Sequence, residues 1–214
     1  MFARRSSSRL KLIEEAVRRG HEIASHTLTH RALTTLSAEQ KRNEIFASRD
    51  RLHAAFGSAP AGFRAPGFHM DAECLDLLAE AGYRYDSSFF PGARVTQQPH
   101  RPMAGTTLLE LPMPGCAPLP FPFHPCFSLV LGMTYYRLAL RRFRSRNAPL
   151  VFLFHLTDFA DPLPPTHLRG WGSKFYTLSH LTGTAKRGRC RRMLDEVRKS
   201  FRIVTTQELL DNYL

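Results

Sequence analysis

The chain has 214 residues, of which 43% are apolar and 22% are charged, a composition typical of an ordinary globular protein. Lysine and arginine total 30 against 18 acidic residues, and the formal net charge is +12. A charge of this size attracts polyanions and anionic surfaces. The basic residues are scattered along the chain, however, and nucleic acid is therefore not expected as a partner.

Cysteine usage and hydropathy bear on the compartment. Four cysteines lie far apart without any CxxC pair, and this spacing argues against a zinc knuckle and a dense disulfide framework. The basic N-terminus lacks the continuous apolar stretch of an export signal, and no window approaches a membrane span. We therefore expect a cytoplasmic protein. It could contact the inner face of a membrane through residues 120–146, which are apolar and then basic.

Helical and extended patterns alternate through the first half of the chain. Periodicity predicts helices over residues 8–19, 37–57 and 71–82, and short strands over 21–25, 63–64 and 83–86. Ser37 and Gln40 form a capping-box pattern, and Asp71 is a second N-cap candidate. Glycines close the three helices.

The second half continues the same alternation. It predicts strands over residues 107–113, 150–154 and 202–205, helices over 134–146 and 190–200, and a terminal helix that begins with the capping box from Thr205 to Glu208. Such alternation is typical of a parallel α/β architecture, in which active-site loops follow the carboxyl ends of strands. We expect a single domain over residues 1–214.

Polar motifs follow three of the predicted strands. His26 and His30 come directly after the first strand, and on a helical turn their spacing would place both imidazoles on one face, ready to share a metal. By itself this spacing is a weak signal in a chain with 10 histidines. The segments FRAPG at 63–67 and LFH at 153–155 end two further strands. The three motifs together indicate one polar site.

The segments GHEIASHTLTH, FRAPGF, YRYDSS and LFH, in this order, resemble successive motifs of the polysaccharide deacetylase family, the NodB homology domain, which is similar to carbohydrate esterase family 4. The resemblance covers residues 8–214 and is sharpest from residue 20 to residue 91. It implies a distorted (β/α) barrel, here N-terminally truncated. Two histidines and one aspartate hold a divalent metal in that barrel.

The resemblance implies a metal site at His26 and His30. Their ligand type suits zinc, with cobalt and nickel as alternatives. The family's third ligand and its catalytic base come from an aspartate pair on the first strand, and the sequence given lacks that strand. Asp158, three residues after His155, is the only acid placed near the expected site. We therefore expect the chain as given to bind metal weakly and to hydrolyse slowly.

The other family roles match residues on the remaining motifs. Arg64 would orient the catalytic base, and the backbone amide of Gly67, just after Pro66, would help to bind the oxyanion. His155 would act as a general acid toward the leaving amine, and Asp86 would steady the arginine. Amide hydrolysis needs an activated water, a stabilised oxyanion and a proton for the amine, and these residue types supply such functions.

The implied activity is metal-dependent hydrolysis of a carbon–nitrogen bond in an amide other than a peptide. It would remove N-acetyl groups from amino sugars in a bacterial glycan or glycolipid. One alternative is a deformylase or deacetylase of a lipid-phosphate-linked amino sugar, which the basic surface favours. Another is a non-catalytic glycan-binding pseudoenzyme, which the missing aspartates favour.

Overall fold

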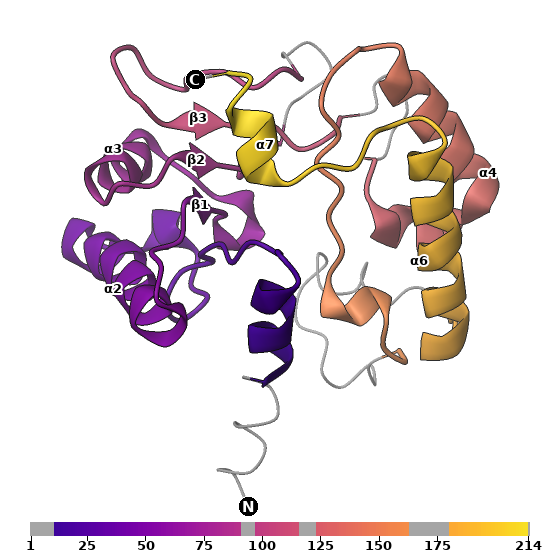
Figure 1. Cartoon of the computed structure of the whole chain (residues 1–214), viewed down its shortest axis with the longest axis horizontal. Coiled ribbons are helices and arrows are strands. Elements are labelled where there is room, and N and C mark those ends of the chain that lie inside the picture. The colour runs from indigo at the N-terminus through magenta and orange to yellow at the C-terminus, as the bar shows by residue number, and fades with distance from the viewer. Residues whose placement is uncertain (1–10, 91–96, 116–122, 163–179, 214) are drawn as a thin grey trace, which may run out of the picture. The chain divides into compact units, whose positions relative to one another are not determined.

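The computed structural model describes residues 11–90, 97–115, 123–162 and 180–213 (Figure 1). The chain divides into two compact units. Unit 1 comprises residues 1–89, 99–111 and 204–214, and unit 2 comprises residues 90–98 and 112–203. The single domain expected from the sequence stays a prediction.

Unit 1 contains a three-stranded parallel sheet. Its strands are β1 (Gly62–Phe63), β2 (Tyr85–Asp86) and β3 (Leu109–Glu110), in the order β1-β2-β3 (Figure 1). The strand predicted over residues 21–25 is reduced to one bridge between Ser25 and Phe63. The parallel pairing confirms the α/β class, while the barrel implied by the resemblance stays a prediction.

The helices described in unit 1 are residues 11–18, η1 (Leu33–Thr35), α2 (Ala38–Phe56), η2 (Pro66–Phe68), α3 (Ala72–Glu80) and α7 (Thr206–Leu210). Three of them, α2, α3 and α7, begin where the sequence places their caps. Ser37 and Gln40 form the predicted capping box, and the Asp71 carboxylate accepts a hydrogen bond from the amide of Cys74. Thr205 caps α7. These caps satisfy amides that lack partners within the helix.

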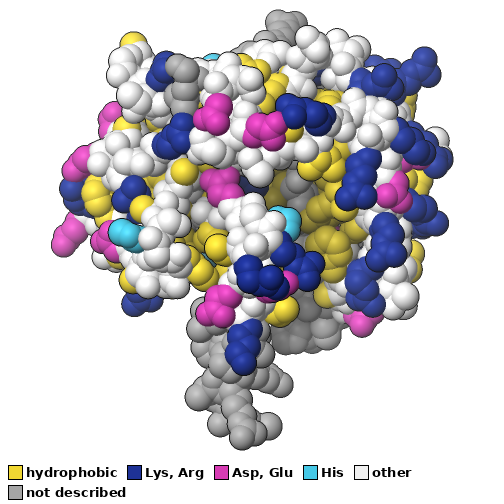
Figure 2. Space-filling model, in the orientation of Figure 1, with side chains coloured by type: hydrophobic (Ala, Val, Ile, Leu, Met, Phe, Trp, Pro, Cys, Tyr) yellow, Lys and Arg dark blue, Asp and Glu magenta, His cyan; other side chains and the backbone are white. Residues whose placement is uncertain are grey.

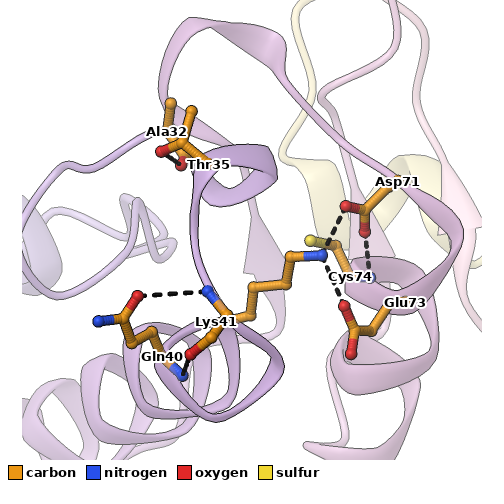
Figure 3. A network of polar contacts seen from close by, with 8 residues as sticks. Ala32, Thr35, Gln40, Lys41, Asp71, Glu73 and Cys74 are labelled. Atoms are coloured by element: carbon orange, nitrogen blue, oxygen red, sulfur yellow. Dashed lines mark hydrogen bonds and ion pairs between the residues drawn. The ribbon is translucent and has the colours of Figure 1, made fainter.

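A buried lysine fastens α2 to the start of α3 (Figure 3). Lys41 is 6% exposed, and its Nζ lies 2.7 Å from Asp71 Oδ2 and 2.6 Å from Glu73 Oε2. These two hydrogen-bonded carboxylates raise the pKa of Lys41. An apolar core that includes Ile45 of α2 and Leu78 of α3 completes the contact. Helix α2 is therefore held by charge as well as by apolar packing.

Unit 2 is built around two helices with η3 (Leu156–Asp158) beside them. Helix α4 (Pro125–Arg144) starts earlier than predicted and is kinked at Gly132, and α6 (Gly183–Arg198) also starts earlier. The strand predicted over residues 150–154 does not form among the described residues. Its phenylalanines pack against the helical core instead. A short apolar run has the same sequence pattern in a buried strand and in a segment packed on helices, so periodicity does not distinguish the two.

The core of unit 2 is largely aromatic. Phe143 is 1% exposed, and its ring lies 6.2 Å from that of Phe123 and 6.3 Å from that of Phe201. The Tyr136 hydroxyl donates to Met193 O at 2.8 Å and joins α4 to α6. The three cysteines among the described residues are buried and reduced. Aromatic packing and this buried hydrogen bond therefore help to hold the pair, together with polar contacts from Arg137 to Glu196 and from Arg189 to Leu129 O.

The two units differ in charge. Among the described residues, unit 2 has thirteen lysines and arginines and four acidic residues, whereas unit 1 has eleven and fourteen. Many basic side chains lie along α6, and Figure 2 shows them as a dark blue margin of the molecule. No helix in the described part of the chain is both long and apolar enough to cross a membrane.

Candidate functional site

The two histidines of the HxxxH motif meet in a loop of unit 1. The ring centroids of His26 and His30 are 4.8 Å apart in an edge-to-face arrangement, and both residues are exposed. The segment does not form the helical turn on which this spacing would share a face, because Thr27 has φ 65° and His30 has φ 61°. The His30 amide donates to Thr27 Oγ1 at 3.1 Å and closes the turn. Left-handed backbone at two non-glycine residues is typical of functional loops.

A backbone carbonyl orients the first histidine. His26 Nδ1 lies 2.7 Å from Arg64 O, and because a carbonyl only accepts, Nδ1 carries the proton. The lone pair of the neutral ring is then on Nε2. Metal-ligating imidazoles are commonly oriented in this way. The histidine pair therefore fits a divalent metal, although no cluster of three or more His, Cys, Asp or Glu suited to a metal occurs among the described residues.

A buried glutamate of α2 binds the segment between the histidines. Glu44 accepts hydrogen bonds at 2.8 Å from the amides of Leu28 and Thr29, and another from the Thr29 hydroxyl. Burial alone would raise the pKa of Glu44, but these hydrogen bonds outweigh it and the pKa is lowered. Sequence reasoning missed Glu44. The available signal was a carboxylate next to Ile45 on the apolar face of a predicted helix.

Arg64 follows β1 and is held by Ser87. Its Nε donates to Ser87 O at 2.8 Å, and its Nη2 donates to Ser87 Oγ at 2.7 Å. Burial lowers the pKa of Arg64, while the nearby Asp86 and Glu110 act in the opposite direction. The charge of Asp86 therefore favours the protonated arginine, while Ser87, the next residue, accepts the two hydrogen bonds that Arg64 donates.

Two buried carboxyl groups share a proton behind the arginine. Asp86 and Glu110 are in register on β2 and β3, are 0% and 2% exposed, and are hydrogen-bonded to each other. Ser88 Oγ donates to Asp86 Oδ1 at 2.6 Å, and the Phe89 amide donates to Glu110 Oε1 at 3.0 Å. Burial, with the charge of Asp86, raises the pKa of Glu110 to about 10. The pair therefore keeps one proton at neutral pH.

Glu110 is the second residue that sequence reasoning missed. It lies inside the predicted strand over residues 107–113, in the apolar run LLELP. An ionisable side chain in such a run must be paired when it is buried. The sequence carried this signal but not the identity of the partner.

The segment that follows Arg64 requires glycine at one position. Gly67 has φ 65°, and a Cβ atom there would lie 2.8 Å from Cδ2 of His69. Pro66 is buried at the start of η2, and the Ala65 amide donates to Ser88 Oγ at 2.8 Å. The backbone that leads into the Gly67 amide is therefore held by Pro66 and Ala65.

His155 lies in unit 2, directly before η3. Its amide donates to Asp158 Oδ2 at 2.8 Å, and its ring centroid is 5.3 Å from that of His124, which caps α4. Asp158 is 1% exposed, and burial raises its pKa. Asp158 thus contacts the backbone of His155. Sequence reasoning missed His124, whose signal was a histidine before the proline that opens a helix.

The family model for polysaccharide deacetylases matches residues 1–85. A peptidoglycan deacetylase of Helicobacter pylori is 29% identical over 82 residues, which is 38% of this chain and 27% of that protein. A peptidoglycan-N-acetylglucosamine deacetylase of Bacillus cereus is 29% identical over 73 residues, which is 34% of each. The chain thus spans about a third or less of the curated relatives that it matches.

Solved structures extend the likeness to most of the chain. A structure titled as a polysaccharide deacetylase of Mycobacterium smegmatis has a TM-score of 0.66 at 20% identity, over 95% of this chain and 66% of that chain. An allantoinase has a TM-score of 0.57 at 15% identity, over 91% and 58%. At these identities the likeness establishes the fold alone. Residues 1–85 are thus similar to the polysaccharide deacetylase family, and most of the chain shares the fold of solved structures such as the one from Mycobacterium smegmatis.

Proposed function

We propose that this chain belongs to a metal-dependent hydrolase that removes N-acetyl groups from amino sugars of a bacterial glycan or glycolipid. The observation that carries the proposal is the hydrogen bond from His26 to Arg64 O, beside a His30 ring 4.8 Å away. It joins the proposed metal ligands to the arginine motif. Two curated relatives that match part of the chain are deacetylases of peptidoglycan by name.

The residues divide the proposed reaction among them. His26 and His30 would hold the metal, with zinc proposed and cobalt or nickel as alternatives. When bound, the metal supplies Lewis-acid polarisation of the amide carbonyl and lowers the pKa of a water molecule. Arg64 would orient the catalytic base, and the Gly67 amide would stabilise the oxyanion. His155 would protonate the leaving amine.

The metal assignment is tested by titrating the chain with zinc chloride while the histidine ring signals are followed by NMR. His26→Ala and His30→Ala should each abolish the zinc-dependent shift of the remaining ring. His53→Ala, an exposed histidine of α2, is the matched control and should behave as the parent. A parent whose His26 and His30 signals ignore zinc would overturn the assignment.

The activity is tested by acetate release from N-acetylglucosamine oligomers. Zinc-dependent release that is lost with Arg64→Ala supports a deacetylase. Binding of the oligomers without release would favour the glycan-binding pseudoenzyme instead. Release from a lipid-phosphate-linked amino sugar but not from free oligomers would favour the lipid-linked substrate, an alternative that the basic charge of unit 2 motivates.

A further inference from the structure

We propose that Glu44 is a positioning residue for the histidine pair, an inference that rests on the proposed function. Its carboxylate would hold the loop between His26 and His30 in the shape that brings the rings together. Glu44 lies on α2, outside the histidine loop in sequence, and is 4% exposed. It would touch neither metal nor substrate, and its effect would pass through the backbone.

Helix α2 fastens the histidine segment at two points, one helical turn apart. Ser48 Oγ lies 2.8 Å from Ser25 Oγ, just before His26. Glu44 accepts from the amides of Leu28 and Thr29, just before His30. Because residues four apart lie on the same helix face, a single surface of α2 supports both ends of the segment.

The loop has the kind of backbone that needs such support. Thr27 and His30 both have positive φ, and Thr27 is β-branched, which makes this conformation especially unfavourable. Strained backbone persists only where its surroundings determine it. The Thr27 hydroxyl accepts from the His30 amide inside the loop. Glu44 supplies support from outside the loop, at the two residues between these strained positions.

A carboxylate suits this position better than any neutral group. Leu28 and Thr29 present three donors, and an ionised carboxylate accepts from all of them through two oxygens. A glutamine could accept both backbone amides through its one carbonyl oxygen, because both bind the same oxygen of Glu44, and its amide group could donate to the Thr29 hydroxyl. It would lack the negative charge that strengthens these bonds, and the donor set therefore favours glutamate.

The position of α2 itself is secured one turn earlier. Lys41 binds Asp71 and Glu73 at the start of α3, as Figure 3 shows. Glu44 therefore projects from a helix that is anchored independently of the histidine loop. A side chain on such a helix can hold the backbone of the loop in one position.

The test compares zinc affinity in the parent chain with that in variants of Glu44. Outer residues that orient metal ligands typically contribute a factor of about 10 to 100 in affinity, and Glu44→Ala should weaken zinc binding by this factor. Glu44→Gln should weaken it less, because one accepting oxygen remains. Glu39→Ala is the matched control, an exposed glutamate of the same helix, and should bind zinc as the parent does.

A second readout separates positioning from stability. In metal-free Glu44→Ala, the nuclear Overhauser contact between the His26 and His30 rings should be lost. The midpoint of thermal unfolding of Glu44→Gln should stay near that of the parent. Zinc affinity of Glu44→Ala within about twofold of the parent would overturn the proposal, even if its Tm falls. If Glu44→Ala does not fold, parent-like zinc affinity in Glu44→Leu, which keeps a similar side-chain volume but pairs with none of the three donors, would overturn it.

The two proposals fail in distinguishable ways. A parent chain whose histidine rings do not respond to zinc would overturn the metal assignment together with the role of Glu44. A parent that binds zinc through His26 and His30, with unchanged binding in Glu44→Ala and Glu44→Leu, would overturn the role of Glu44 alone.

Discussion

The two units bury different kinds of side chain. Unit 1 encloses charged and polar residues that are all engaged, among them Lys41, Glu44, Asp86 and Glu110. Unit 2 encloses an aromatic cluster around Phe143, with fewer buried charged groups such as Asp158 and Lys186, and most of its arginines are exposed. The described residues give unit 1 an excess of three negative charges and unit 2 an excess of nine positive charges.

The two kinds of buried side chain have different consequences for the orientation of neighbouring residues. Buried polar networks are costly unless every member is satisfied, and in return they fix one arrangement of their neighbours. Unit 1 uses them where the histidine loop and the arginine must be oriented. Unit 2 obtains its stability from apolar area, which sets fewer demands on direction. Substitutions should therefore act on orientation in unit 1 and on packing in unit 2.

The largest effect is expected from truncating the aromatic core of unit 2. Phe143→Ala removes a 1% exposed ring, and the lost burial and the cavity should cost about 3–5 kcal/mol. Urea unfolding measures the loss, and hydrogen exchange should locate it in α4 and α6. The 39% exposed Phe89 of unit 1 is the control, and Phe89→Ala should cost much less. Equal losses would contradict the contrast.

The next effect is a pH dependence that arises in unit 1. Folded Glu110 has a pKa of about 10 against a usual value of 4.5. Between these values the folded state keeps a proton that the unfolded state has lost, so stability falls as pH rises. The slope for one proton is about 1.4 kcal/mol per pH unit.

Glu110→Gln keeps a hydrogen-bond donor toward Asp86 and removes the ionisation. Urea unfolding from pH 5 to pH 9 should therefore give a flatter stability profile than that of the parent. Exposed Glu39→Gln should leave the parent profile unchanged. A Glu110→Gln profile as steep as the parent's would show that other groups carry the dependence.

One substitution should have opposite signs in the two units. Gly67→Ala forces a side chain at φ 65° and into the ring of His69, and should destabilise by about 1–3 kcal/mol. Gly188→Ala falls in the open interior of α6, with nothing within 4 Å of the added Cβ, and should stabilise by about 0.5–1 kcal/mol. Thermal unfolding of both variants measures the signs. Destabilisation by Gly188→Ala would mean that the helix face is not open.

The smallest effect concerns a buried hydrogen bond between the unit 2 helices, from Tyr136 of α4 to Met193 of α6. Tyr136→Phe removes the hydrogen bond to Met193 O without changing the ring, and should cost about 1 kcal/mol. Denaturant unfolding with an unchanged slope measures it. A cost above that of Phe143→Ala would indicate that unit 2 depends on polar orientation as unit 1 does.

Local chemistry could be read directly from the sequence. The start of α2 follows from Ser37 and Gln40, that of α3 from Asp71, and that of α7 from Thr205, because each cap pairs atoms only three residues apart. The motif order also indicated the polysaccharide deacetylase family, whose model matches residues 1–85. These features depend on neighbours along the chain, which a single sequence displays in full.

Tertiary structure decided what depends on partners distant in sequence. The sequence suggested that His26 and His30 meet on a helical turn, but a positive-φ loop held by Glu44 brings them together. The register of β2 and β3 selects Glu110 as the partner of Asp86. The apolar run over 150–154 packs on helices without forming a strand. In each case contacts between side chains far apart in the sequence determine which of several local conformations of similar energy is adopted. Periodicity within a short window carries no information about those contacts.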